Sequence, residues 1–179
     1  YRNATWYQEQ QRSMESMAKQ LGFAKVSQMK LAVAKRIKEF VAGGGFLFTM
    51  CSGTDTYDIA LSAEGLDICE SMYDGDGTTP SYNDHLDFSK TFAFSNHTLS
   101  VNPLEYRFSN IDVTTTRRVP RDEDVFTLFD FSAKWDPIPA MLVQNHTTTV
   151  KGFMGQATAF KKSLIKSDVL ILGDTKSAS

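Results

Sequence analysis

The sequence predicts an α/β domain with a mostly parallel sheet. Two short apolar segments, 46–50 and 169–172, are bounded by turn residues and have the composition of strands that are buried on both faces. The first segment lies between two stretches with helical apolar spacing. An order of helix, glycine-rich turn, buried strand, turn and helix is typical of parallel sheets whose faces are covered by helices.

Three helices are predicted around the first apolar strand. Apolar residues recur at helical spacing over 6–21, and a second apolar stripe begins after Ser27, a residue type that caps helices. The glycines at 43–45 end this second helix. Thr54 or Asp55 caps the third helix. This order places the strand between two helices that pack on the sheet.

The second half of the chain begins with a long acidic loop at 73–84. Asp74 and Asp76 in this loop could hold calcium, but the spacing does not fit an EF-hand, and a solvated loop is the favoured interpretation. Because the strand at 169–172 has little chain after it, we expect a sheet that is incomplete at both ends. Short extended segments are predicted before it, at 91–94, 104–108, 111–115 and 125–131.

The composition indicates one globular domain over residues 1–179. Hydrophobic residues make up 41% of the chain and charged residues 22%, both close to average values. A net charge of -2 provides no basic field for nucleic acid, and no apolar run is long enough for a transmembrane helix. No cofactor motif is found, and Cys51 and Cys69 do not make a zinc site.

The turn after the first strand raises the question of whether Cys51 is a nucleophile or a structural thiol. Residues that follow a parallel strand face the ligand crevice, and the N-terminus of the next helix favours the thiolate. The backbone N–H groups of Ser52 and Gly53 could then form an oxyanion hole. The alternative is a small buried cysteine that closes a strand, since free cysteine is among the most buried residue types. Both interpretations remain open.

The stretch EFVAGGGFLFTMCSGTDTYDIAL, residues 39–61, resembles the central segment of the class I glutamine amidotransferase-like superfamily, particularly its ThuA-like branch. The amidotransferase elbow reads Gly-x-Cys-x-Gly; this chain has the cysteine and the second glycine but Thr49 in place of the first glycine. ThuA-like members usually hold a histidine where Cys51 stands. The resemblance implies a flavodoxin-like three-layer sandwich with a mostly parallel sheet.

Longer segments are similar to a bacterial family widely labelled asparagine synthetase B, among them DICESMYDGDG, NPLEYRFSNIDV and FTLFDFSAKWDPIPAML. The resemblance implies a periplasmic or cell-envelope location, envelope protein partners and a longer parent chain. The label suggests ATP-dependent synthesis, and residues 52–56 resemble the pyrophosphate loop of true synthetases. That loop lacks one glycine here, and Tyr1 stands where glutamine-hydrolysing synthetases have their cysteine. Asparagine synthetase activity is therefore not expected.

A cysteine nucleophile needs a base within hydrogen-bond reach. The histidines of this chain are His85, His97 and His146. The resemblance places the triad histidine and its acid after a late strand, beyond this chain. His146, which follows the apolar run AMLVQN, is the best internal candidate for the base, and a hydrogen-bonded loop histidine is the alternative.

Two functions follow from these residues and from the resemblance. The first is a glutamine amidotransferase-like envelope protein acting as a cysteine-dependent amide or small-molecule hydrolase, with Cys51 as nucleophile. The second is a non-catalytic binding or scaffold subunit of an envelope complex, which could bind a small molecule or a carbohydrate. Aromatic faces stack on sugar rings, although core packing explains most aromatic residues equally well. The candidates for a sugar crevice are Trp6, Tyr7, Tyr57, Tyr73 and Trp135.

Overall fold

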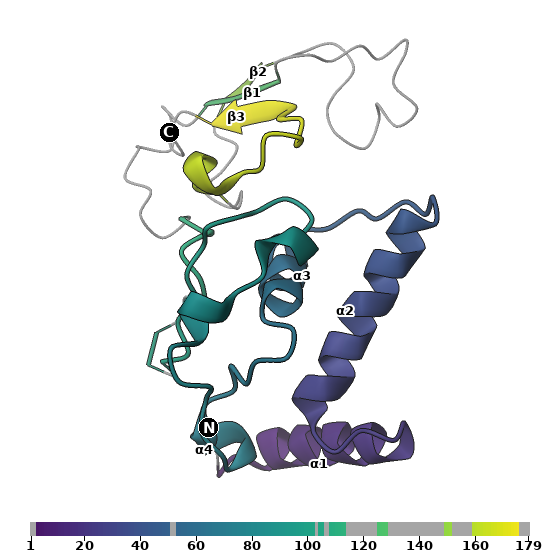
Figure 1. Cartoon of the computed structure of the whole chain (residues 1–179). Helices are drawn as coiled ribbons and strands as arrows, with labels where there is room; N and C mark the ends of the chain where they lie inside the picture. Colours follow the sequence, from purple (N-terminus) through teal and green to yellow (C-terminus); the bar gives the residue numbers. More distant parts are fainter. Residues whose placement is uncertain are drawn as a thin grey trace.

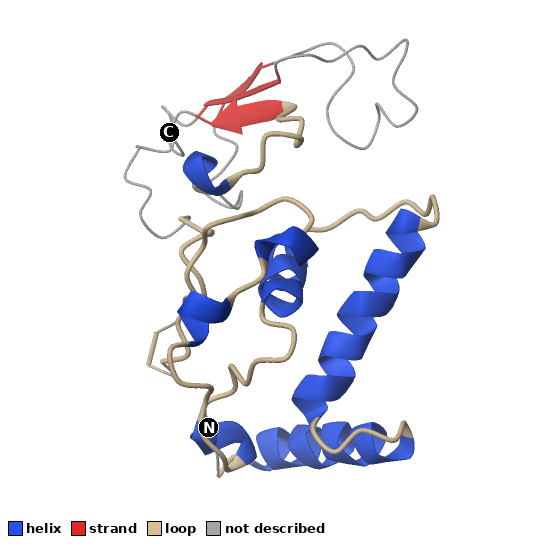
Figure 2. Ribbon diagram, in the orientation of Figure 1, coloured by secondary structure: helices blue, strands red, loops and turns tan. Residues whose placement is uncertain are grey.

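The computed structural model describes residues 3–50, 53–102, 104–105, 108–113, 125–128, 149–151 and 159–175. Helices make up most of the regular structure in these residues (Figures 1 and 2). The α-helices are α1 (Thr5–Gln20), α2 (Val26–Ala42), α3 (Gly53–Ser62) and α4 (Ser71–Asp74). The short 3-10 helices are η1 (Tyr82–His85), η2 (Phe88–Lys90) and η4 (Lys162–Leu164), and the strands are β1 (Val125–Leu128), β2 (Thr149–Lys151) and β3 (Gly173–Thr175).

The three predicted helices are confirmed, with small changes at their ends. α1 ends before Gly22, whose φ of 82° is in the left-handed region that suits glycine. α2 begins one residue before Ser27, and its N-cap is Lys25, whose backbone N–H donates to Gln28 Oε1 at 3.3 Å. Ser27 is therefore not the cap, because the side chain of Gln28 already bonds the start of the helix.

The predicted flavodoxin-like sandwich with a mostly parallel sheet is wrong for the described residues. The strands they contain form one small sheet in the order β2-β1-β3, and both pairs are antiparallel. In the register, Phe126 lies opposite Val150 on one side and Thr175 on the other. Helices do not cover both faces of a parallel sheet in this part of the chain (Figure 2).

The two apolar segments that were expected to be buried strands are exposed. In the segment 46–50, exposure reaches 62% for Phe46 and 71% for Met50, and the backbone belongs to no described strand. Leu170, Ile171 and Leu172 are also exposed, and only the chain after them enters β3. A buried strand needs neighbours on both edges and a layer on each face, and the described residues supply neither.

α1 and α2 frame one side of the described structure, and α1 lies across the N-terminal end of α2 (Figure 1). Met29 and Ala34 are the buried side chains of α2. Lys35 and Lys90 both pair with Glu64, and Lys38 Nζ donates to the carbonyl of Lys90 at 2.6 Å. These contacts join α2 to the end of α3 and to η2. None of the described helices is both long enough and apolar enough to cross a bilayer.

Three segments that are far apart in sequence meet beside α3. Phe94, Ile111 and Leu164 form a buried cluster, and Ile59 of α3 packs against it. Isolated β-bridges join Phe94 to Ile165 and Asp112 to Phe160. The predicted extended segments 91–94 and 111–115 therefore contribute single bridges in their described parts rather than regular strands.

The carboxylate of Asp58 fixes this arrangement to α3. It is 1% exposed and accepts hydrogen bonds from the backbone N–H groups of Phe92, Ala93 and Phe94 at 2.5, 2.8 and 2.8 Å. A buried carboxylate is costly unless its lone pairs are used, and three backbone donors meet that requirement. These hydrogen bonds hold the loop at 92–94 in place, so that Phe94 packs in the apolar cluster.

Asp58→Asn should destabilise the protein by about 3 kcal/mol, because the amide turns an NH₂ group toward buried backbone donors and leaves them unsatisfied. Urea unfolding monitored by circular dichroism measures this loss. The matched control is Asp84→Asn, an exposed aspartate, which should change the free energy of unfolding by less than about 0.5 kcal/mol. Equal effects of the two substitutions would contradict the role given to Asp58.

Candidate functional site

A cavity of about 620 Å³ lies between α1, the start of α2 and the loop that leads into α4. We call it the Tyr7–Tyr73 cavity. Its walls combine two tyrosines and aliphatic groups with amide, hydroxyl and charged side chains. The lining residues are Tyr7, Gln10, Gln11, Met14, Glu15, Ala18 and Lys19 of α1, residues 24–27 and Lys30 around the start of α2, and Cys69, Tyr73 and Asp74.

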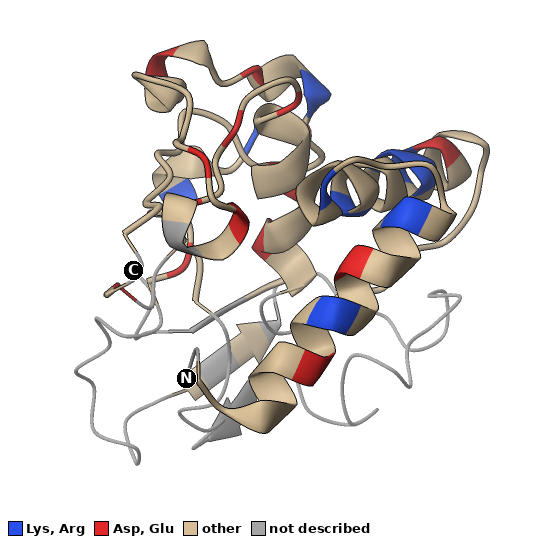
Figure 3. Ribbon diagram, turned by 90° about the horizontal axis from the view of Figure 1, so that it is seen from below, with Lys and Arg blue, Asp and Glu red and all other residues tan. Residues whose placement is uncertain are grey.

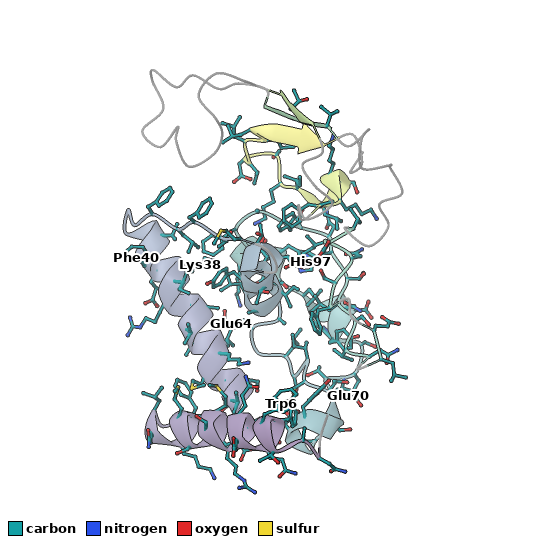
Figure 4. All side chains as sticks on the ribbon, turned by 180° about the vertical axis from the view of Figure 1, so that it is seen from behind. Trp6, Lys38, Phe40, Glu64, Glu70 and His97 are labelled. Atoms are coloured by element: carbon teal, nitrogen blue, oxygen red, sulfur yellow. The ribbon has the colours of Figure 1, made fainter. Side chains whose placement is uncertain are left out.

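The cavity brings together two of the five aromatic residues that were predicted to line a sugar crevice. Tyr7 comes from α1 and Tyr73 from α4, so two different helices contribute them. The ring of Trp6 packs edge-on against Tyr7, with ring centroids 5.9 Å apart. Trp6 lies near the end of α1 that is beside α4 (Figure 4). Tyr57 does not line the cavity, and Trp135 lies outside the described residues.

Lys25 closes one side of the cavity by binding the acidic loop. Its Nζ lies 2.9 Å from Asp67 Oδ2 and 3.4 Å from Asp74 Oδ2, and it also pairs with Asp76. The hydrogen bonds to Asp76 and Asp67 raise the pKa of Lys25, and the ammonium in turn lowers the pKa of Asp76. The acidic loop is therefore held by ion pairs to the N-cap residue of α2 and is not merely solvated.

The same three aspartates are the described residues best placed to hold a cation. Their carboxylate oxygens lie within 4.8 Å of one another, close enough for a shared hard metal ion. The Lys25 ammonium already lies among them and supplies the positive charge. Any metal would have to compete with this side chain for the same lone pairs.

Cys69 lies at the cavity wall as a neutral thiol. Its backbone N–H donates to Asp67 Oδ1 at 2.9 Å. Burial, together with the negative charge of Asp74, raises the pKa of the Cys69 thiol to about 11. Because the thiolate is the nucleophilic form, Cys69 is unreactive at neutral pH.

Most of the predicted catalytic residues lie outside the described part of the chain. Cys51, Ser52 and His146 are among them, so the catalytic assignment stays a prediction. α3 begins at Gly53, two positions after Cys51 in the sequence, as expected for a cysteine that precedes a helix. The Gly53 N–H donates to the carbonyl of Met50 at 3.1 Å, so a role in an oxyanion hole requires that this bond open.

A buried serine–histidine pair was not predicted from the sequence. Ser62 Oγ lies 3.0 Å from His97 Nε2, and the imidazole is 2% exposed, with the Phe88 ring edge-on at 4.9 Å. His97 Nδ1 has no hydrogen-bond partner among the described residues. The nearby Asp58 carboxylate is occupied by backbone donors, so among the described residues no carboxylate orients the ring. The pair packs α3 against the loop before Leu99 (Figure 4).

Comparison with family models, with curated proteins and with solved structures finds no match for this chain. Functional inference therefore depends on the geometry of the described residues. In the part of the chain that the structure describes, the Tyr7–Tyr73 cavity has ligand-binding character, because it combines volume, aromatic surface and a few polar groups.

Stability should fall as the pH decreases from about 7.5 to 5.5, because of His97. Burial lowers the pKa of His97 in the folded state below its ordinary value of 6.5. Between the two values the unfolded chain binds a proton that the folded chain does not, so acid favours unfolding. Between the two pKa values, the free energy of unfolding should decrease by up to about 1.4 kcal/mol for each pH unit.

Urea unfolding at pH 5.5, 6.5 and 7.5 measures this dependence. His97→Phe fills the ring volume without a titrating group, and the Ser62 hydroxyl keeps its hydrogen bond to the carbonyl of Ile59. The difference in pH slope between the wild type and this variant isolates His97 from the other ionisable groups. Identical slopes for the two proteins would show that His97 is not the titrating group.

Proposed function

We propose that this chain is a binding protein whose Tyr7–Tyr73 cavity takes a carbohydrate ligand. The observation that carries the proposal is that two tyrosines from different helices line one cavity of about 620 Å³. Sugars present C–H faces and a rim of hydroxyl groups. A site for them needs aromatic surface with hydrogen-bonding groups close by.

The polar lining of the cavity supports a neutral, hydroxyl-rich ligand. Gln10, Gln11 and Ser27 are uncharged donors and acceptors, and the Asp74 carboxylate is an acceptor of hydroxyl protons. The charged residues of the lining are mixed in sign, with Glu15 and Asp74 acidic and Lys19, Lys25 and Lys30 basic, and Lys25 is paired with three aspartates. α1 itself carries acidic and basic residues in alternation (Figure 3).

Saturation-transfer-difference NMR with maltotriose, cellotriose and chitotriose tests the proposal. At least one of these neutral trisaccharides should receive saturation at its ring C–H protons. Tyr73→Ala should weaken binding by about ten-fold or more, because loss of the contact between one aromatic ring and the sugar should cost at least about 1.4 kcal/mol of binding free energy. Tyr7→Ala should act in the same direction.

The matched control is Phe108→Ala, which removes an aromatic ring that is 64% exposed and does not line the cavity. It should leave the saturation signal unchanged. Absence of signal with all three sugars, or equal loss in the Phe108 variant, would contradict carbohydrate binding at this cavity. Circular dichroism of each variant confirms that the helices are retained.

A second candidate function is cysteine-dependent hydrolysis of an amide or small molecule at Cys51. The observation that favours it is the start of α3 at Gly53, which provides a helix N-terminus directly after the predicted nucleophile. Ser52 and Gly53 remain the proposed oxyanion donors and His146 the proposed internal base. A periplasmic or envelope location and envelope protein partners are likewise proposals, supported by the family resemblance of the sequence.

Cys51 should react with iodoacetamide at half-maximal rate well below pH 8.5, the usual pKa of a free thiol, if it is a nucleophile. Mass spectrometry of peptides after labelling at pH 6 to 9 measures the rate. Cys69 gives little interference, because its pKa is raised to about 11. Cys51→Ser should abolish the rapid labelling and any amidase activity.

The control for this experiment is Cys69→Ser, which should leave the labelling rate of Cys51 unchanged. A Cys51 thiol that labels only above pH 8.5, or that is inert until the protein unfolds, is a structural residue. In that case the hydrolase proposal fails and the binding proposal stands by itself.

A further inference from the structure

We propose that the segment Phe46–Met50 is a homodimerisation strand that pairs antiparallel with the same segment of a second copy of this chain. The segment links α2 to α3 and is extended over its whole length (Figure 1). Exposure alternates along it: Phe46, Phe48 and Met50 are exposed, and Leu47 and Thr49 are half-buried. This alternation is typical of a β-strand that packs one face against the protein and exposes the other face to solvent.

The backbone of this segment has unused hydrogen-bonding groups. Among the described residues, the backbone hydrogen bonds that flank it are Gly45 N–H to the Phe40 carbonyl and Gly53 N–H to the Met50 carbonyl. Neither engages the N–H groups of residues 46–50. An extended segment with free N–H and C=O groups and an apolar face is a template for pairing with another strand. A segment that pairs with residues 46–50 must therefore also be extended and apolar.

A second copy of the chain meets these requirements. Residues 40–54 contain no charged side chain, so two copies of the segment can approach without electrostatic repulsion. In an antiparallel pair centred on residue 48, Phe48 faces Phe48, and Phe46 of each copy faces Met50 of the other. Aromatic pairs directly opposite each other are among the favourable cross-strand pairs.

The apolar area supports a weak dimer. Phe40, which packs on Gly45 at the end of α2, is 59% exposed and extends the patch (Figure 4). With Phe46, Phe48 and Met50, exposed at 62%, 46% and 71%, it presents roughly 900 Å² of apolar side-chain surface over two copies. Edge-to-edge pairing covers the flanks of these side chains and leaves their outer faces open, so the buried area stays below the size of about 1,000 Å² at which specific interfaces begin.

Sedimentation equilibrium of the full chain tests the proposal. The weight-average mass should rise from monomer toward dimer at concentrations on the order of 100 µM, as expected for a weak dimer with a dissociation constant in that range. Phe48→Asp should weaken dimerisation by at least about ten-fold, because two carboxylates would face each other across the pair. Leu104→Asp, at a residue that is 91% exposed and outside the segment, should leave the dimer unchanged.

Disulfide trapping tests the register. In a background of Cys51→Ser and Cys69→Ser, Phe48→Cys should form an intermolecular disulfide readily, since opposed Cα atoms lie about 4.5 to 5.5 Å apart. Phe46→Cys should not, because two residues 46 are separated by about 13 Å along the strands. A protein that stays monomeric, a dimer that survives Phe48→Asp, or equal trapping at both positions would overturn the proposal.

Discussion

The Asp58 carboxylate is the interaction on which the centre of the structure depends. It lies in the third helix and binds three consecutive backbone N–H groups of a loop more than thirty residues later, at 2.5 to 2.8 Å. Ile59 of the same helix packs against the cluster of Phe94, Ile111 and Leu164. The hydrogen bonds to the loop and the apolar contacts therefore support each other in this region.

A second charged anchor shapes the candidate site. Lys25, the N-cap residue of α2, binds three aspartates and thereby fixes the acidic loop, whose residue Tyr73 lines the same cavity as residues of α1. Exposed ion pairs contribute little to stability singly, but a cluster around one ammonium fixes geometry. The cavity owes its second aromatic wall to this cluster, which connects the electrostatics of the loop to the proposed carbohydrate site.

The proposed functions use different parts of the molecule. The cavity lies at the junction of α1, α2 and α4, and Cys51 precedes α3, to which α2 is connected by the extended segment that we assign to dimerisation. Ligand binding therefore does not depend on the reactivity of the thiol.

The sequence by itself determined the three long helices, since apolar spacing and a left-handed glycine are local properties of the chain. It did not determine their caps, because the predicted caps Ser27, Thr54 and Asp55 all lie inside helices. It also placed Tyr7 and Tyr73 among the sugar-crevice candidates, but it could not show which of the five aromatic residues line the same cavity. Only the tertiary structure decided this, and only the tertiary structure showed that the two segments predicted to be buried strands are exposed. An apolar run such as 46–50 has the same composition whether a sheet covers it or not, and burial depends on partners that a local pattern does not contain. The Ser62–His97 and Asp58 contacts went unpredicted for the same reason, because each joins groups more than thirty residues apart.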